Sequence, residues 1–119
     1  IILCLLLCSN VVAHEMTPTY PKWEVSYIEG VQKTTMKMFN KRKDASWYEI
    51  GIFDKEWKPI FFATKNKILK IDYLGHAKFD VYINAGDVKR TEYICSTSKL
   101  RKNDSNKPMV VSKICSRFK

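Results

Sequence analysis

Apolar and polar side chains alternate with a period of two through most of the chain, from residue 23 to residue 118. The clearest stretch is residues 77–83, where Phe79, Val81 and Ile83 are separated by charged or polar side chains. A period of two places alternate side chains on opposite faces of a β-strand, whereas a helix repeats every 3.6 residues. No stretch keeps a helical period. The sequence therefore predicts an all-β protein.

Turn-forming residues divide the alternating region into seven expected strands. These strands cover residues 22–28, 32–39, 46–53, 67–73, 77–83, 90–98 and 108–118. Residues 40–44 are interpreted as the charged turn of a hairpin, and residues 60–64 as a crossover. Seven short strands without connecting helices predict two packed antiparallel sheets, an immunoglobulin-like Greek-key β-sandwich. The apolar faces of the expected strands hold Trp23, Val25, Tyr27, Thr34, Met36, Met38, Tyr48, Ile50, Ile52, Phe79, Val81 and Ile83, which are expected to point inward. The expected strand at residues 67–73 contains Ile68, Leu69 and Ile71.

The first thirteen residues carry no charge, and their leucine-rich core leads into small residues that end at Ala13. Residues 1–13 are therefore interpreted as a secretory signal peptide, truncated at its start because neither Met nor a basic region precedes the core. The run is too short to span a bilayer core of about 30 Å. A buried strand or helix and a lipid-attachment site at Cys8 are alternative interpretations. Residues 14–119 then form one domain, periplasmic or secreted, with no transmembrane segment.

The chain is strongly basic, with 21 Lys and Arg against 12 Asp and Glu and a formal net charge of +9. Such a balance favours acidic partners. A nucleic-acid surface would need several basic residues on one face together with exposed aromatic rings. The basic residues here are scattered over turns and outward strand positions, so a solvated surface is expected and nucleic acid is not the expected partner.

Two cysteines remain after the signal peptide is removed, Cys95 and Cys115. Export places them in an oxidising compartment, where a bridge would remove about 3 kcal/mol of unfolded-chain entropy. The last two expected strands would bring them face to face if they pair antiparallel. Two free, buried thiols are the alternative. No Cys or His cluster has the spacing of a zinc site.

Several aromatic residues lie in the expected strands and turns. Tyr93 lies two residues before Cys95, the spacing of the tyrosine corner of immunoglobulin domains, and an ordinary strand tyrosine is an equal alternative. Trp47 and Trp57 are expected to pack rather than to form a ligand platform.

Four stretches together resemble a known family. They are residues 34–40 (TTMKMFN), residues 47–64 (WYEIGIFDKEWKPIFFAT), residues 68–83, and the pair 90–98 and 111–119. Their order resembles the N-terminal immunoglobulin-like domain of periplasmic pilus-assembly chaperones. Short exported proteins of marine phages and bacteria also look similar.

The resemblance implies a way of binding. In that family a basic residue on the first strand and a lysine on the last strand hold the C-terminal carboxylate of a pilus subunit, and the last strand donates alternate apolar side chains. Lys113 matches the last-strand lysine, whereas the first-strand position falls near Glu24, of opposite charge, with Lys22 close by. The family's second domain has no counterpart in these residues.

The expected function is therefore binding of another exported protein, such as a pilus-type or surface subunit, through an exposed edge strand. The expected contact residues are Val110, Val111, Lys113 and Arg117. No catalytic motif is found among the residues, so the protein is not expected to be an enzyme or to need a cofactor.

The sequence is also compatible with two other functions, a copper-binding protein and a structural component. Cleavage after Ala13 would make His14 the N-terminus, and an α-amine with an imidazole chelates copper. His14 and His76 could approach at one pole of the sandwich, and the alternative is that both are solvated loop residues. The third possibility is a structural component of a phage or cell surface.

Overall fold

The computed structural model describes residues 14–99 and 111–118. The predicted signal peptide and Val110 lie outside these residues. Within them, the chain forms nine strands and one 3-10 helix, and the prediction of an all-β sandwich is confirmed. The elements are β1 (Glu15–Thr17), β2 (Glu24–Val25), β3 (Val31–Phe39), β4 (Trp47–Phe53), β5 (Ala63–Thr64), β6 (Ile68–Lys70), β7 (His76–Asn84), η1 (Ala85–Arg90), β8 (Tyr93–Lys99) and β9 (Lys113–Arg117).

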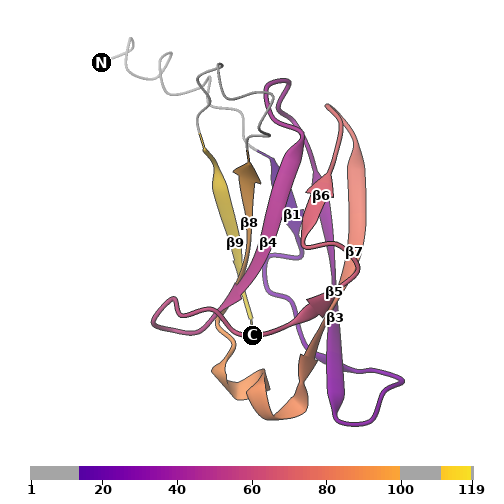
Figure 1. Cartoon of the computed structure of the whole chain (residues 1–119), viewed down its shortest axis with the longest axis vertical. Helices are drawn as coiled ribbons and strands as arrows, with labels where there is room; N and C mark the ends of the chain where they lie inside the picture. Colours follow the sequence, from indigo (N-terminus) through magenta and orange to yellow (C-terminus); the bar gives the residue numbers. More distant parts are fainter. Residues whose placement is uncertain (1–13, 100–110, 119) are drawn as a thin grey trace.

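The strands form two antiparallel sheets (Figure 1). Sheet A has the order β1-β3-β7-β5, and β2 pairs with β3 on the same side as β1. Sheet B has the order β6-β4-β8-β9. In the part of the chain that the structure describes, no helix is long and apolar enough to cross a membrane.

The expected hairpin between residues 32–39 and 46–53 is wrong, because β3 and β4 lie in different sheets. Residues 40–44 carry the chain from one layer to the other. Met36 of β3 and Ile50 of β4 both belong to the buried core, so the two strands bury these side chains between the layers. Alternation along a strand predicts which residues are buried but not which strand lies beside it.

Nine of the predicted inward side chains form the centre of the core. Each of them is no more than 7% exposed, and together they come from both sheets. They are Thr34, Met36, Met38, Tyr48, Ile50, Ile52, Phe79, Val81 and Ile83. The prediction is confirmed for these three long strands, whose alternating apolar side chains are removed from water between the layers.

The first expected strand, residues 22–28, is largely wrong. Its regular part is only the two-residue β2, and Val25 and Tyr27 are 85% and 86% exposed. The Ser26 hydroxyl donates to the Val31 carbonyl at 2.6 Å, which closes a local turn before β3. Ile68, at the start of β6, is 47% exposed. Both β2 and β6 are edge strands, so each has a sheet neighbour on one side only.

Candidate functional site

β9 is an edge of sheet B, and its hydrogen-bond register shows which backbone groups face outward. Ser98 N–H donates to the Ser112 carbonyl and Phe118 N–H donates to the Glu92 carbonyl, each at 2.9 Å. Residues in an antiparallel strand alternate between pointing toward and away from their partner. Lys113, Cys115 and Arg117 therefore direct their N–H and C=O groups away from β8.

The same register explains the disulfide. Cys95 and Cys115 are cross-strand partners, and they occupy a non-hydrogen-bonded pair, where side chains lie closest. The two residues form a disulfide with a Cα–Cα distance of 4.1 Å, which confirms the predicted pairing. The bridge fixes β9 to β8 along its outer face.

β1 lies close to β9, and the segment just after β1 bonds to the outward edge of β9 at one residue. Arg117 N–H donates to the Thr19 carbonyl at 3.2 Å. In residues 14–99 and 111–118, no backbone hydrogen bond reaches the outward groups of Lys113 or Cys115. Unpaired N–H and C=O groups of this kind are a template for pairing with another strand.

Three of the four predicted contact residues lie along this edge, and the fourth, Val110, lies outside the described residues. Val111 is 61% exposed just before β9, and Lys113 and Arg117 are both exposed on the outer face of sheet B. Arg117 pairs with Glu92 at 2.8 Å. The Lys113 ammonium instead lies over the aromatic rings of Phe53 and Trp57.

The structure does not assemble the carboxylate-holding pair that the family resemblance implies. Glu24 lies in β2, where it pairs with Lys33 in sheet A, whereas Lys113 belongs to sheet B. Among the described residues, neither Lys22 nor Glu24 makes an ion pair or hydrogen bond with Lys113.

The two histidines point to opposite faces of sheet A. Glu15 aligns with Phe39, which aligns with His76, so these three side chains share the outer face. His14 precedes Glu15 and faces inward, where it is only 1% exposed. The structure therefore does not bring His14 and His76 together. The alternative that both are solvated is wrong for His14, because it is buried; His76 is exposed and stacks on Phe39.

Both ring nitrogens of His14 are engaged in hydrogen bonds. Nδ1 lies 3.1 Å from the Ser112 hydroxyl, and Nε2 lies 2.7 Å from the Ser96 hydroxyl. Among the described residues, no group of three or more His, Cys, Asp and Glu side chains could hold a metal ion. The geometry thus gives no support to the copper interpretation.

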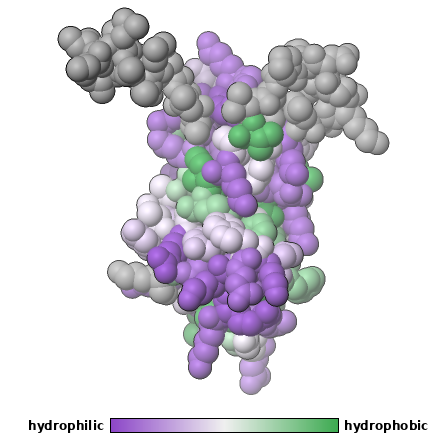
Figure 2. Space-filling model, turned by 90° about the vertical axis from the view of Figure 1, so that its left-hand side faces the viewer, coloured by the Kyte–Doolittle hydropathy of each residue, from purple (hydrophilic) through white to green (hydrophobic). Residues whose placement is uncertain are grey.

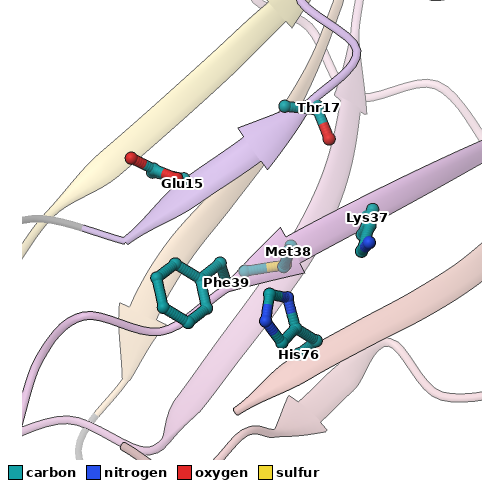
Figure 3. A pocket seen from close by; sticks show the side chains of 6 residues that line it. All are labelled: Glu15, Thr17, Lys37, Met38, Phe39 and His76. Carbon is teal, nitrogen blue, oxygen red and sulfur yellow. The ribbon is translucent and has the colours of Figure 1, made fainter. Parts of the chain in front are cut away.

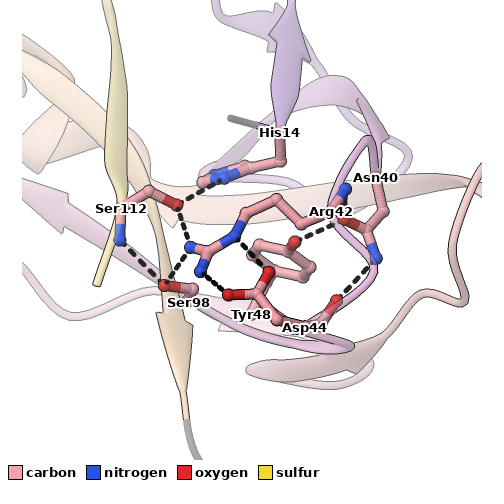
Figure 4. A network of polar contacts seen from close by, with 8 residues as sticks. His14, Asn40, Arg42, Asp44, Tyr48, Ser98 and Ser112 are labelled. Carbon is pink, nitrogen blue, oxygen red and sulfur yellow. Dashed lines mark hydrogen bonds and ion pairs between the residues drawn. The ribbon is translucent and has the colours of Figure 1, made fainter. Parts of the chain in front are cut away.

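His14 belongs to a polar network that joins the two sheets (Figure 4). Arg42 donates from Nη1 to the hydroxyls of Ser112 (3.1 Å) and Ser98 (3.4 Å). Its Nε and Nη2 donate to the two carboxylate oxygens of Asp44 at 2.9 and 2.6 Å. The residues interpreted as a charged turn thus place a cation, only 6% exposed, between β1 and β9.

Asn40 is the second centre of this network. Its Oδ1 accepts from the Tyr48 hydroxyl (2.6 Å) and from Arg42 N–H (2.9 Å). Its Nδ2 donates to the carbonyls of Ala45 and Ile71 at 2.7 and 2.8 Å. Burial raises the pKa of Tyr48 to about 12, so its hydroxyl stays a donor over the physiological range.

Sequence reasoning missed this network, although one signal of it was present. Ser96 and Ser98 occupy inward positions of the period-two pattern of β8, where apolar residues would be expected. Buried hydroxyls need hydrogen-bond partners, so two such serines on one face indicate buried polar groups opposite them.

We predict that stability depends on pH through His14. Burial lowers the pKa of His14, a hydrogen bond with the Ser96 backbone opposes this, and the charge of Arg42 lowers it again. The unfolded chain therefore binds a proton at a higher pH than the folded chain does. The contribution of His14 to the free energy of unfolding is complete above pH 6.5, the ordinary pKa of histidine. It is lost as the pH falls through the lower pKa of the folded state.

The measurement is urea unfolding at several pH values between 7 and 5. We expect the free energy of unfolding of His14→Gln to fall less over this range than that of the wild type. The control is Asn66→Ala, an exposed residue without a titratable group, which should keep the wild-type slope. Equal slopes for the wild type and His14→Gln would contradict the prediction.

A shallow pocket of about 190 Å³ lies on the outer face of sheet A (Figure 3). Its walls hold Glu15, which pairs with Lys41, and His76, which stacks on Phe39. The complete lining is Glu15, Thr17, Lys37, Met38, Phe39 and His76. The pocket lies on the other sheet from β9 and is not part of the candidate edge.

No protein-family model matches the chain, and no curated protein matches it. Among solved structures, the periplasmic chaperone SfaE matches with a TM-score of 0.54 and 14% identity, over 89% of this chain and 56% of that one. PapD-like domain 7 of human CEP192 matches with a TM-score of 0.54 and 6% identity, over 88% and 81%. A FixG-related protein from Vibrio parahaemolyticus matches with a TM-score of 0.49 and 11% identity, over 91% and 96%.

The matches to SfaE and to the CEP192 domain define the class of the fold. The chain has a PapD-like immunoglobulin fold, as the family resemblance implied. The likeness is one of fold, since the identities are 14% or lower. The chain spans about half the length of SfaE.

Proposed function

We propose that this chain is an exported, non-catalytic module that binds another exported protein by strand addition to β9. The observation that carries the proposal is the outward edge of β9, where the N–H and C=O groups of Lys113 and Cys115 have no backbone partner among the described residues. The similarity of fold to SfaE, a periplasmic chaperone, supports it. The disulfide supports an oxidising compartment, periplasmic or extracellular.

The disulfide also prepares the edge for binding. Because Cys115 is bonded to Cys95, β9 is held in its register before a partner arrives. A pre-ordered strand loses less conformational entropy on association than a free one. Lys113 adds positive charge on the outer face, which favours a partner strand with an acidic side chain beside it.

A single proline tests the edge. Lys113→Pro removes the outward N–H and keeps the ladder with β8, because proline is tolerated where the N–H faces away from the sheet. The partner is first captured from periplasmic extract with the wild-type domain, identified by mass spectrometry, purified, and titrated by calorimetry. We expect Lys113→Pro to weaken this binding at least about tenfold, through a lost hydrogen bond and the bulk of the ring.

The matched control is Lys70→Pro on β6, the opposite edge of sheet B. Ile71 N–H donates to the Ser46 carbonyl at 2.8 Å, so the neighbouring Lys70 faces away from β4. Lys113→Gln keeps the N–H and removes only the charge. Unchanged affinity for a folded Lys113→Pro variant would rule out strand addition at β9.

A further inference from the structure

Three aromatic side chains form a shelf on the outer face of sheet B: Phe53, Trp57 and Tyr93. The rings of Trp57 and Tyr93 are stacked, with centroids 4.0 Å apart and planes 2° from parallel. Phe53 lies beside them, its centroid 6.0 Å from that of Trp57. Trp57 remains 48% exposed, so part of its ring is accessible to a ligand.

The backbone of Trp57 is held in a conformation that disfavours any side chain. Its φ is +65°, in the left-handed region. The turn is fixed by Asp54, whose carboxylate accepts from the N–H groups of Glu56 and Lys58 at 2.9 Å each. Glycine would occupy this position without steric cost, yet the chain has tryptophan. A strained residue whose side chain is exposed points to a function of that side chain.

The shelf extends toward the binding edge. Gly51, Cys95 and Cys115 form one row across sheet B. A Cβ at Gly51 would lie 2.9 Å from two atoms of the Phe53 ring, so that ring covers the glycine. The shelf therefore lies next to the disulfide that holds β9.

Two lysines, one whose ammonium lies over the shelf and one in the turn that carries Trp57, have no carboxylate partner among the described residues. The Lys113 ammonium lies 4.9 Å from the Phe53 ring centroid and 5.0 Å from that of Trp57. Lys55 is in the same turn as Trp57. Neighbouring cations do have such partners: Lys58 with Glu56, and Arg117 with Glu92. The turn after β4 projects to the left in Figure 1. Figure 2 shows that side of the molecule, where the surface is mostly hydrophilic with smaller apolar areas.

We propose that the shelf receives an aromatic side chain of the partner segment that pairs with β9, and that this segment carries carboxylates next to the aromatic residue. The inference rests on the proposed function. The distance from β9 to the shelf is short enough for one segment to contact both, because the Lys113 side chain starts on β9 and its ammonium lies over the shelf. A second copy of this chain fits poorly, because its net charge of +9 would place like charges together.

The experiment uses nuclear magnetic resonance of the 15N-labelled protein, which has three tryptophan indole signals. The probe is a ten-residue peptide of threonines with a central phenylalanine and a glutamate two residues to each side. One control peptide replaces the phenylalanine by alanine, and a second replaces both glutamates by lysine. Chitohexaose, an uncharged sugar, tests the other common ligand of an exposed tryptophan.

We expect the probe to shift the Trp57 indole signal together with the backbone amides of Lys113 and Cys115. Each control peptide should bind the wild-type protein about tenfold more weakly than the probe does. The probe should also bind the Trp57→Gly variant about tenfold more weakly, and glycine suits the observed φ at this position. Trp57→His keeps a flat ring in a residue that tolerates this conformation, and should recover part of the affinity.

The readouts separate the two proposals. Shifts of the β9 amides without the Trp57 indole would overturn the shelf and support strand addition. Shifts of the indole without the amides would support recognition of the ring and count against pairing with β9. An indole shift with chitohexaose alone, or no shift with any probe, would overturn the shelf and leave strand addition to the Lys113→Pro experiment.

Discussion

Asn40→Ala is expected to lower the free energy of unfolding by about 3 to 5 kcal/mol, a large part of the total stability of a small domain. The side chain of Asn40 is fully buried and makes four hydrogen bonds. Its removal leaves the Tyr48 hydroxyl and the carbonyls of Ala45 and Ile71 without this partner. Buried polar groups that lose their partners pay the full cost of desolvation.

Equilibrium unfolding in urea, followed by tryptophan fluorescence, measures this loss. The matched control is Asn66→Ala, an exposed asparagine, which should change stability by no more than about 0.5 kcal/mol. A loss below about 1 kcal/mol for Asn40→Ala would mean that water replaces the amide at little cost. In that case the polar network does not hold the two layers together.

Removal of the disulfide by Cys95→Ala with Cys115→Ala is the second prediction with a large effect. We expect the free energy of unfolding to fall by about 3 kcal/mol, because the bridge closes a loop with a sequence separation of 20 residues. The reduced wild-type protein should lose a similar amount. Both are measured by urea unfolding.

The control for the disulfide is the neighbouring cross-strand pair in the same register, Thr97 with Lys113. Its double alanine variant removes side-chain contacts but no covalent link, and should cost about 1 kcal/mol or less. If the two double variants were equally stable, the bridge would contribute nothing beyond local packing, and β9 would not depend on it for its position.

Part of the fold was predictable because it depends only on local alternation. Met36 and Met38, or Val81 and Ile83, repeat every second residue, and any strand that buries one of each pair buries the other. The disulfide followed from counting cysteines after the predicted cleavage and from pairing the last two strands. The candidate edge at Lys113 came from the family resemblance, and its binding role remains a prediction.

Other features depend on which segments meet in space. His14 and Ser112 are 98 residues apart in the sequence and 3.1 Å apart in the structure. Nothing in the local pattern around Arg42 distinguishes a solvated cation from one that is 6% exposed. Trp57 was expected to pack, and it does stack on Tyr93, but its left-handed backbone and its exposure are visible only in three dimensions.

The sequence by itself determined that this chain forms strands and which side chains of β3, β4 and β7 are buried, and it predicted the pairing of Cys95 with Cys115. The tertiary structure decided that β3 and β4 lie in different layers, that Asn40, Arg42 and His14 are buried together, and that Phe53, Trp57 and Tyr93 share a surface next to β9. The physical reason is that alternation is set by the geometry of one strand, whereas layer, neighbour and burial of polar groups are set by contacts between distant segments.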